Sequence, residues 1–365
     1  PQGSPGPPVS GRRAPGGAVV RGAQAPAPRL PLPPGAGMES GRVTGLWCYP
    51  IKSCGGVGPL EAAAVARTGL QGDRRWALVD AARGGRFLSQ RRCPGMARIR
   101  PSLPPEYFSE PGWGGSGGAF TRAPPGAVLR VEAPEAPEGE ALEVPLAPAG
   151  VGPERWAAAG ARAVSVWGWK GRAVDEGDAA AAWFARVLGV DGVRLVRYCG
   201  DDPEAAAAAG DEGEARRAVV RDAGCRPLPP EDAGGTPVQT AFADGFPILL
   251  TSEATLAELN GRLEAGGSLP VGMDRFRPNI TVAGFASGAE DAWEAVELGG
   301  DAGGAALTFT VAKPCARCAV PGVDQRSGEV PEPGEPLRTL GELRSGAALL
   351  AAGRRAYAEP SWRGQ

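Results

Sequence analysis

The chain has 365 residues, of which 57 are glycine and 38 are proline, a share of about a quarter that borders on low-complexity sequence. A hydrophobic content of 42%, with nine tryptophans and nine phenylalanines, still indicates a packed core, so the glycine and proline excess is expected in tails and insertions. The chain contains no histidine, which excludes Ser-His-Asp triads, Cys-His pairs and His-ligated zinc or haem. A net charge of −2 gives no reason to expect nucleic-acid binding.

The N-terminal segment 1–41 is expected to be a disordered tail, because residues 1–38 are rich in Pro, Gly, Ala and Arg and contain no acidic residue. Two interpretations stay open: an organelle transit peptide, or an over-extended gene model ahead of Met38. No secretory signal and no apolar run of about 18 residues is present. We therefore expect an intracellular protein, in the cytosol, the mitochondrion or another organelle, with reduced thiols and no transmembrane segment.

A β-rich domain is expected over 42–205, where short runs of β-branched and aromatic residues alternate with Gly and Pro. One clear helix is predicted at 177–188, since its apolar residues recur at helical spacing and Gly189 follows as a stop. The Gly-rich stretch 111–118 is typical of a surface insertion. The predicted strands of this domain are 43–49, 75–79, 86–90, 97–100, 127–132, 141–145, 163–167 and 193–198.

An acidic, Pro- and Gly-rich linker or insertion at 206–238 separates this domain from a second one at 239–346. In the second domain, Thr251 is a plausible N-cap, and Leu256, Leu259 and Leu263 form the apolar stripe of an amphipathic helix. Strands are predicted at 279–283 and 306–311, and 347–365 is an atypical tail. Many short strands with few helices predict an α+β fold with a barrel-like sheet.

The strongest local signal for chemistry is Cys315-Ala-Arg-Cys318, which follows a predicted strand. Three interpretations compete: a zinc site completed by Cys48, Cys54 and Cys93, a redox-active thiol pair, or one soft thiolate ligand for the metal of a cofactor.

Cationic clusters at the predicted starts and ends of strands suggest an anion site. Lys52 and Ser53 follow one strand, and Arg74 and Arg75 begin another. Arg275, Arg277 and Asn279 precede a third. Guanidinium and ammonium groups recognise phosphate, and a carboxamide can pair with the edge of a heterocycle. Taken singly, each cluster is more simply interpreted as solvated loop charges.

These clusters, in this order, resemble the motifs of MOSC-domain proteins. The first half carries Tyr49-Pro-Ile-Lys-Ser-Cys54, Gly72-Asp-Arg-Arg-Trp76 and Phe87-Leu-Ser-Gln-Arg91. The second half carries Asp244-Gly-Phe-Pro247, Ser252-Glu-Ala254, Arg275-Phe-Arg-Pro-Asn-Ile280, Cys315-Ala-Arg-Cys318, Val323-Asp-Gln-Arg-Ser-Gly328 and Leu337-Arg-Thr-Leu-Gly-Glu-Leu343. The resemblance covers residues 42–345 and is strongest to the amidoxime-reducing branch of the family. It implies an N-terminal β-barrel domain followed by a mainly antiparallel, barrel-like MOSC domain.

The resemblance also implies a molybdenum cofactor, in which molybdopterin carries a phosphate, a pterin and a dithiolene that holds the metal. Cys318 matches the thiolate ligand of molybdenum and is thus the expected catalytic residue, whereas Cys315 is expected to shape the turn. Cofactor-binding positions in this sequence are Lys52, Ser53, Arg74, Asp244, Gly245, Phe246, Arg277, Asn279, Ala316 and Arg317.

By the same resemblance, the reaction is the two-electron reduction of N-hydroxylated compounds such as amidoximes, hydroxylamines and N-hydroxyguanidines. Electrons would come from NADH through a flavin reductase and a b-type haem cytochrome, since the chain carries no flavin or haem motif. The alternative is a molybdenum cofactor-binding or sulfur-carrying module like the C-terminal domain of molybdenum cofactor sulfurase, which has an additional pyridoxal-phosphate domain. The last strand of the family's domain is expected to be missing, since 349–365 lacks its motifs.

Overall fold

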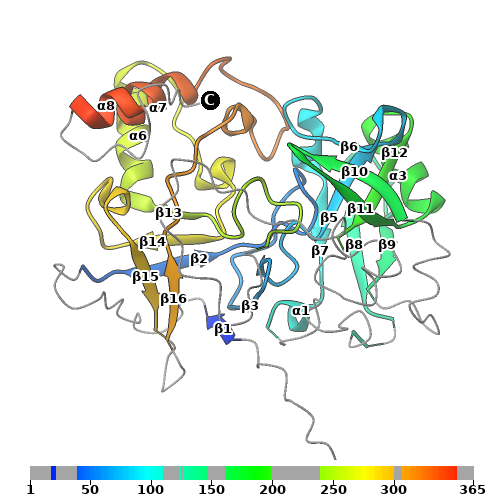
Figure 1. The fold of residues 1–365 in the computed structure, drawn as a ribbon. Helices are drawn as coiled ribbons and strands as arrows, with labels where there is room; N and C mark the ends of the chain where they lie inside the picture. Colours follow the sequence, from blue (N-terminus) through cyan, green and yellow to red (C-terminus); the bar gives the residue numbers. More distant parts are fainter. Residues whose placement is uncertain are drawn as a thin grey trace, which may run out of the picture.

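The computed structural model describes residues 18–21, 39–109, 123–124, 126–146, 161–198, 239–299 and 306–351. Helices and strands are mixed, which confirms the α+β class. Two lobes lie side by side, one formed mainly by the first half of the chain and the other mainly by the second half (Figure 1). The predicted insertion at 111–118, the linker at 206–238 and most of the two predicted tails lie outside the described residues.

A closed five-stranded barrel forms the centre of the first lobe. The strands follow one another around the barrel in the order β10 (Ala161–Val166), β11 (Trp169–Asp175), β12 (Val193–Arg197), β5 (Trp76–Asp80) and β6 (Arg86–Phe87). Period-two alternation sends Val164, Val166 and Phe87 into the core, where they pack with Tyr198 and Phe242. β11 was not predicted, because its basic residues mask the alternation.

The helix α3 (Asp178–Leu188) packs against β12 and β9 and confirms the prediction for 177–188. Gly177 is its N-cap, and Gly189 ends it in the left-handed region at φ 62°. Next to it lies an antiparallel sheet of β7 (Arg100–Ser102), β8 (Val128–Glu132) and β9 (Leu142–Pro145). The short helix α1 (Pro105–Ser109) lies between β7 and β8 in the chain.

One predicted strand of this lobe is wrong. The first half of 97–100 belongs to the 3₁₀ helix η2 (Pro94–Arg98), and β7 begins only at Arg100. Pro94 occupies the first helical position, where its fixed φ favours helical backbone and its missing N–H costs nothing.

The second lobe contains a sheet in which a strand from the first half of the chain pairs with strands from the second half. β13 (Leu250–Ser252) pairs in parallel with β14 (Ile280–Ala283), which pairs antiparallel with β2 (Arg42–Leu46). A hairpin of β15 (Ala295–Leu298) and β16 (Leu307–Thr310) shares the core of Leu46, Val282 and Trp293. The strands of the described part of this lobe form these two small sheets, whereas the closed barrel lies in the first lobe.

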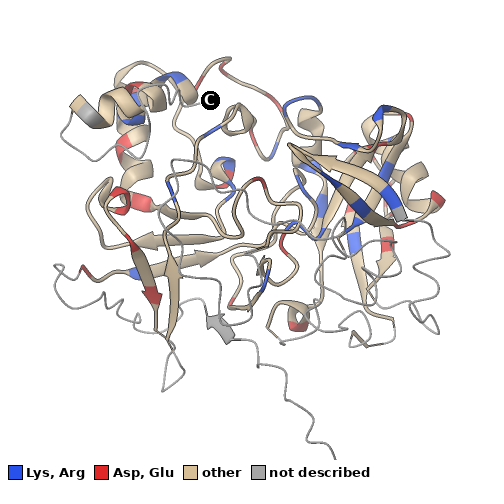
Figure 2. Cartoon of the chain, viewed as in Figure 1, with Lys and Arg blue, Asp and Glu red and all other residues tan. Residues whose placement is uncertain are grey.

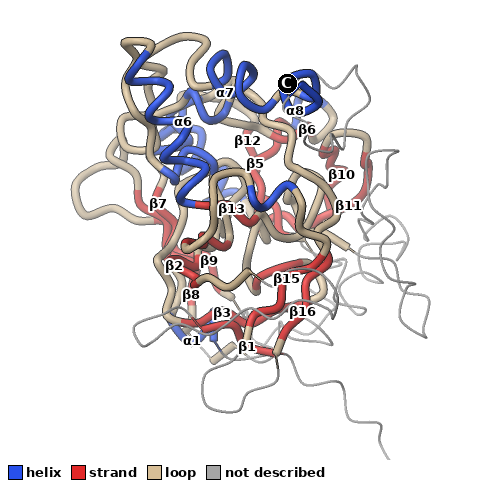
Figure 3. The backbone as a smooth tube through the Cα atoms, turned by 90° about the vertical axis from the view of Figure 1, so that its left-hand side faces the viewer, coloured by secondary structure: helices blue, strands red, loops and turns tan. Residues whose placement is uncertain are grey.

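Three helices lie at one end of the second lobe: α6 (Glu253–Ala265), α7 (Leu337–Arg344) and α8 (Gly346–Ala351). In the view of Figure 3 these helices lie above the strands β2, β15 and β16. As predicted, α6 buries Leu259 and Leu263, but its N-cap is Ser252 rather than Thr251, because Thr251 remains in β13 paired with β14. No helix in the described part of the chain has the length and hydropathy needed to cross a bilayer.

A third sheet joins β3 (Ala62–Ala66) to β4 (Gly69–Leu70) and to β1 (Ala18–Arg21). β1 belongs to the segment expected to be a tail, and its pairing with β3 gives its backbone hydrogen-bond partners. The remaining short 3₁₀ helices lie in connections: η1 (Ala81–Arg83), η4 (Met273–Phe276), η5 (Ala289–Asp291) and η7 (Val320–Gly322).

Candidate functional site

A cavity of about 1110 Å³ extends through the second lobe and is also lined by residues of the first half of the chain. Every residue that the sequence analysis assigned to the site lines it, so the structure brings the whole predicted set together. The set is Lys52, Ser53, Arg74, Asp244, Gly245, Phe246, Arg277, Asn279, Ala316, Arg317 and Cys318. Their contacts are described below; their roles toward a cofactor stay predictions.

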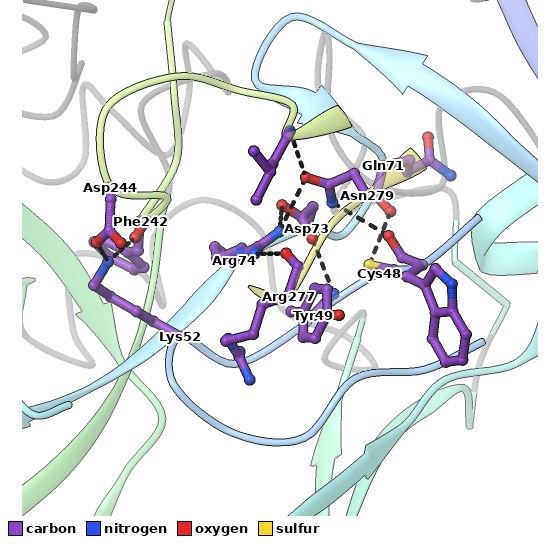
Figure 4. Close-up of polar contacts among 12 residues, drawn as sticks. Cys48, Tyr49, Lys52, Gln71, Asp73, Arg74, Phe242, Asp244, Arg277 and Asn279 are labelled. Carbon is purple, nitrogen blue, oxygen red and sulfur yellow. Dashed lines mark hydrogen bonds and ion pairs between the residues drawn. The ribbon is translucent and has the colours of Figure 1, made fainter. Parts of the chain in front are cut away.

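Lys52 lies in the loop after β2, which is held against the start of β5. Its backbone N–H donates to the Trp76 carbonyl at 2.7 Å, and the Trp76 N–H donates to Pro50 at 2.9 Å. The Lys52 ammonium donates to the Phe242 carbonyl at 2.7 Å and to Asp244 at 2.5 Å (Figure 4). Desolvation by the neighbouring protein atoms opposes ionisation of Asp244, although its side chain is largely exposed. The charge and hydrogen bond of Lys52, with the Trp167 hydrogen bond and the Arg74 charge, together outweigh it and hold the pKa of this carboxyl well below its usual range.

Arg74 is tied to residues from both halves of the chain. Its Nη1 donates to Asp73 at 2.5 Å and to the Asn279 Oδ1 at 3.2 Å, and its Nη2 donates to the Arg277 carbonyl at 3.0 Å. Asp73 is 3% exposed and also accepts from the Tyr49 N–H at 2.9 Å. The carboxylate thus compensates the Arg74 charge and fixes the position of its guanidinium.

Arg277 carries the least compensated charge of the site. Its guanidinium lies 4.3 Å from the centre of the Tyr49 ring, which the Arg74 guanidinium also approaches at 4.4 Å. Its Nη1 donates to Gln325 at 3.3 Å, but its Nη2 is buried without a hydrogen-bond partner. Burial and the neighbouring Arg74 charge lower the pKa of Arg277 to about 10, so it is still cationic at neutral pH.

Asn279 uses its carboxamide within the protein. Its Oδ1 accepts from the Leu249 N–H at 3.1 Å as well as from Arg74, and its Nδ2 donates to the Trp47 carbonyl at 3.2 Å. With 1% exposure, it links β2, β14 and Arg74. These contacts favour a supporting position behind Arg74 over pairing with a heterocycle.

The Cys315–Cys318 segment is a loop between β16 and η7. Arg317 holds it against η4, since its Nη2 donates to the Phe276 carbonyl at 2.8 Å while its Nη1 contacts the Cys315 sulfur at 3.1 Å. The Arg317 Nε is buried without a hydrogen-bond partner. Cys318 is half-buried and lines the cavity, whereas Cys315 is exposed.

The zinc interpretation finds no support in the described residues, where no three Cys, Asp or Glu side chains group as a metal site would need. Cys48 and Cys54 are buried in the core, and burial raises the pKa of Cys54 to about 12. A thiol that stays protonated is a poor metal ligand. The redox-pair interpretation loses its helix N-terminus, since only the three-residue η7 follows the pair.

Backbone strain concentrates around the cavity. The non-glycine residues of the described chain with positive φ are Ser53 at 67°, Arg74 at 46°, Arg277 at 56° and Trp167 at 54°. The first three line the cavity, and the Trp167 indole donates to the Asp244 carboxylate at 3.0 Å. Such conformations are costly for residues with a Cβ and cluster at functional sites.

Sequence reasoning missed several supporting residues: Tyr49 under the two guanidiniums, the buried Asp73, Trp167, and the Gln90–Gln325 pair at 3.0 Å that joins the two halves. Except for Trp167, each lies within one of the motifs, which was the available signal. Asp324 is a turn carboxylate: hydrogen bonds from the amides of Ser327 and Arg326, and then the Arg275 guanidinium, lower its pKa to about 2.

Comparisons with known proteins match both halves to one family. The MOSC N-terminal beta barrel domain matches residues 40–191, and the MOSC domain matches residues 237–358. A molybdenum cofactor sulfurase of Anopheles gambiae is 29% identical over 86% of this chain, which spans only 34% of that protein. Mitochondrial amidoxime reducing component 2 of Bos taurus is 28% identical over 84% of this chain and 73% of its own length. Mitochondrial amidoxime-reducing component 1 of Mus musculus is 28% identical over 84% of this chain and 72% of its own. The chain is therefore a protein of the MOSC family, in which an N-terminal MOSC β-barrel domain precedes the MOSC domain.

Proposed function

We propose that this chain binds a molybdenum cofactor in the cavity and reduces N-hydroxylated compounds, such as amidoximes, hydroxylamines and N-hydroxyguanidines. The observation that carries the proposal is the meeting of unpartnered cationic nitrogens and a half-buried thiol in one cavity. Relatives of similar length are named amidoxime reducing components, which supports the same reaction.

The residues present fit such a cofactor. Its phosphate needs cationic donors, and Arg277 Nη2 and Arg317 Nε are buried donors with none of their hydrogen-bonding capacity used. Lys52 and Arg74, each paired with a carboxylate, line the same cavity. Molybdenum accepts a soft thiolate, and Cys318 is half-buried at the cavity whereas Cys315 is exposed.

When bound, the cofactor supplies the two-electron redox change that the chain's own side chains lack. The overall step converts an N–OH group, two electrons and two protons into an N–H group and water. Cys318 would hold the metal, while Arg277, Arg317 and Lys52 would hold and orient the anionic end. Protons come from water or from carboxylates, because the chain has no histidine.

The electrons come from NADH through a flavin reductase and a b-type haem cytochrome, by the family resemblance. The names of the amidoxime-reducing relatives include the word mitochondrial, which is the support for a mitochondrial compartment. A cytosolic or organellar location is consistent with the same chemistry.

The test compares two cysteine variants that differ in one expected function. Cys318→Ala should lower bound molybdenum and benzamidoxime reduction by at least about 100-fold, because it removes the thiolate that is the proposed ligand. Cys315→Ala should keep both, because Cys315 is not a proposed ligand. Molybdenum is measured by mass spectrometry and turnover with dithionite-reduced methyl viologen as donor. Equal metal content and activity in both variants would sink the ligand assignment.

The alternative is a cofactor-binding or sulfur-carrying module, favoured by the 29% identity to the Anopheles gambiae sulfurase. It predicts that the purified chain holds molybdenum cofactor but reduces no N-hydroxylated compound with the artificial donor. The same assay on the unmodified chain therefore separates the two functions.

A further inference from the structure

An exposed tryptophan occupies a strained position at the rim of the site. Trp167 lies in the turn between β10 and β11, is 50% exposed and has a φ of 54°. This left-handed region favours glycine, and Gly168 is the adjacent residue. The fold therefore holds a half-exposed aromatic side chain on a strained backbone, and such strained positions cluster at functional sites.

The ring is anchored to the site on its inner side. It packs edge-on against Phe87 with 5.2 Å between ring centres, and its Nε1 donates to Asp244, the partner of Lys52. The Lys52 ammonium in turn lies 4.9 Å from the centre of the Phe87 ring. Trp167 is thus connected to the cavity wall by direct contacts.

Positive charge surrounds the ring on its outer side. The Arg91 guanidinium lies 4.5 Å from the centre of the Trp167 ring. In the barrel register, Ser165 of β10 pairs with Arg86 of β6 and with Lys170 of β11, so both basic side chains leave the same outer face as Ser165. Arg86, Arg91 and Lys170 are all exposed.

These basic side chains differ from several surface arginines that pair with a carboxylate. Arg98, Arg130, Arg186 and Arg338 each pair with a glutamate, whereas no carboxylate of the described residues pairs with Arg86, Arg91 or Lys170. Asp80 lies directly opposite Arg86 in the antiparallel register of β5 and β6, and its carboxylate is engaged by Arg83. In Figure 2, basic residues mark several strands of the barrel, although the chain as a whole carries a net charge of −2.

We propose that this face, formed by Arg86, Arg91, Trp167 and Lys170, is the docking surface for an acidic patch of the protein that delivers electrons to the site. The inference rests on the proposed reductase function. Unpaired exposed charges steer an oppositely charged partner, and an exposed Trp flanked by Arg is typical of an energetic centre of an interface. A membrane surface is the weaker fit, because polybasic lipid-binding segments carry about 4–8 basic residues.

The test uses the double variant R86E/K170E, with the single charge reversal Arg262→Glu on the exposed side of α6 as a control elsewhere on the surface. Binding of the full chain to a b-type haem cytochrome is measured by surface plasmon resonance at low and high salt. The double variant should raise Kd about tenfold at low salt and lose most of the salt dependence, whereas Arg262→Glu should leave both unchanged.

Turnover separates this inference from the proposed function. With reduced methyl viologen, all variants should reduce benzamidoxime at the unmodified rate; with the cytochrome and its NADH-dependent reductase, the double variant should be about tenfold slower at low donor concentration. Absent viologen turnover in the unmodified chain overturns the reductase function, while the binding measurement still decides the surface. The docking proposal is overturned if all variants bind the cytochrome equally. It is also overturned if the double variant loses binding to phosphatidylserine vesicles but keeps its binding to the cytochrome.

Discussion

Two buried arginines, one in the barrel lobe and one in the cavity, are satisfied very differently. Arg197 on β12 is 1% exposed and donates to both carboxylate oxygens of Glu176 and to the carbonyls of Pro145 and Leu146. Arg277 is 8% exposed, lies near the second cation Arg74, and leaves its Nη2 without a hydrogen-bond partner. Removing Arg197 would leave a buried carboxylate uncompensated, whereas the unsatisfied Nη2 of Arg277 is available to the proposed cofactor.

The largest expected effect is on the free energy of unfolding and tests the difference between the two arginines directly. Arg197→Met should lower the free energy of unfolding of the cofactor-free chain by about 3–5 kcal/mol, because it leaves the Glu176 carboxylate buried and unpaired. Arg277→Met should change it by less than about 1 kcal/mol or raise it, since it removes an incompletely paired charge. Urea unfolding followed by tryptophan fluorescence measures both. Equal destabilisation by the two variants contradicts the distinction.

A second, smaller effect concerns the ring under the two guanidiniums. Tyr49→Leu should destabilise the chain by about 2 kcal/mol, because it removes buried aromatic surface and two cation–π contacts. It should also lower bound molybdenum, since Arg74 and Arg277 lose their common platform. Tyr49→Phe is the matched control and should keep both properties. Full molybdenum content in Tyr49→Leu would show that the ring does not position the arginines.

The smallest effect is the pH dependence of the Lys52–Asp244 pair. The folded-state pKa of Asp244 is depressed, so its contribution to stability is present above the carboxyl's unfolded pKa near 4 and is lost as pH falls through the lower folded value. Asp244→Asn should therefore be less stable than the unmodified chain at pH 7, and the difference should shrink on acidification. Because the Asp244 side chain is 67% exposed, solvent screening keeps the effect small. A difference that stays constant between pH 7 and pH 3 would assign the destabilisation to something other than charge.

Helices and strands could be predicted from the local sequence where the segment itself shows a clear periodicity and bounding Gly or Pro residues. The helix α3 was predicted at 177–188 because its apolar residues repeat at helical spacing between two glycines. The strands β5, β8, β9 and β12 were found from short β-branched runs bounded by Gly and Pro. Elements without such contrast were missed: β3 is nearly all alanine, and β15 is a short run of mixed character.

Every residue predicted for the site lines the cavity, while their roles toward a cofactor stay predictions. The hydrogen bonds among these residues could not be predicted from the sequence. The carboxamide of Asn279 was expected to recognise a ligand, yet its hydrogen bonds go to Trp47, Arg74 and Leu249. A motif identifies residue types, but which atoms remain available depends on what packs around them.

The reactive groups available to this protein can be read from its sequence: no histidine, one C-x-x-C thiol pair, and cations at strand ends. Which of these groups meet depends on the fold. β2 pairs with β14, and Lys52 reaches Asp244 across 192 positions of the chain, as Arg74 reaches Asn279 across 205. The physical reason is that local periodicity encodes which face of an element is buried, while the partner of that face is chosen by packing and hydrogen bonding over the whole fold.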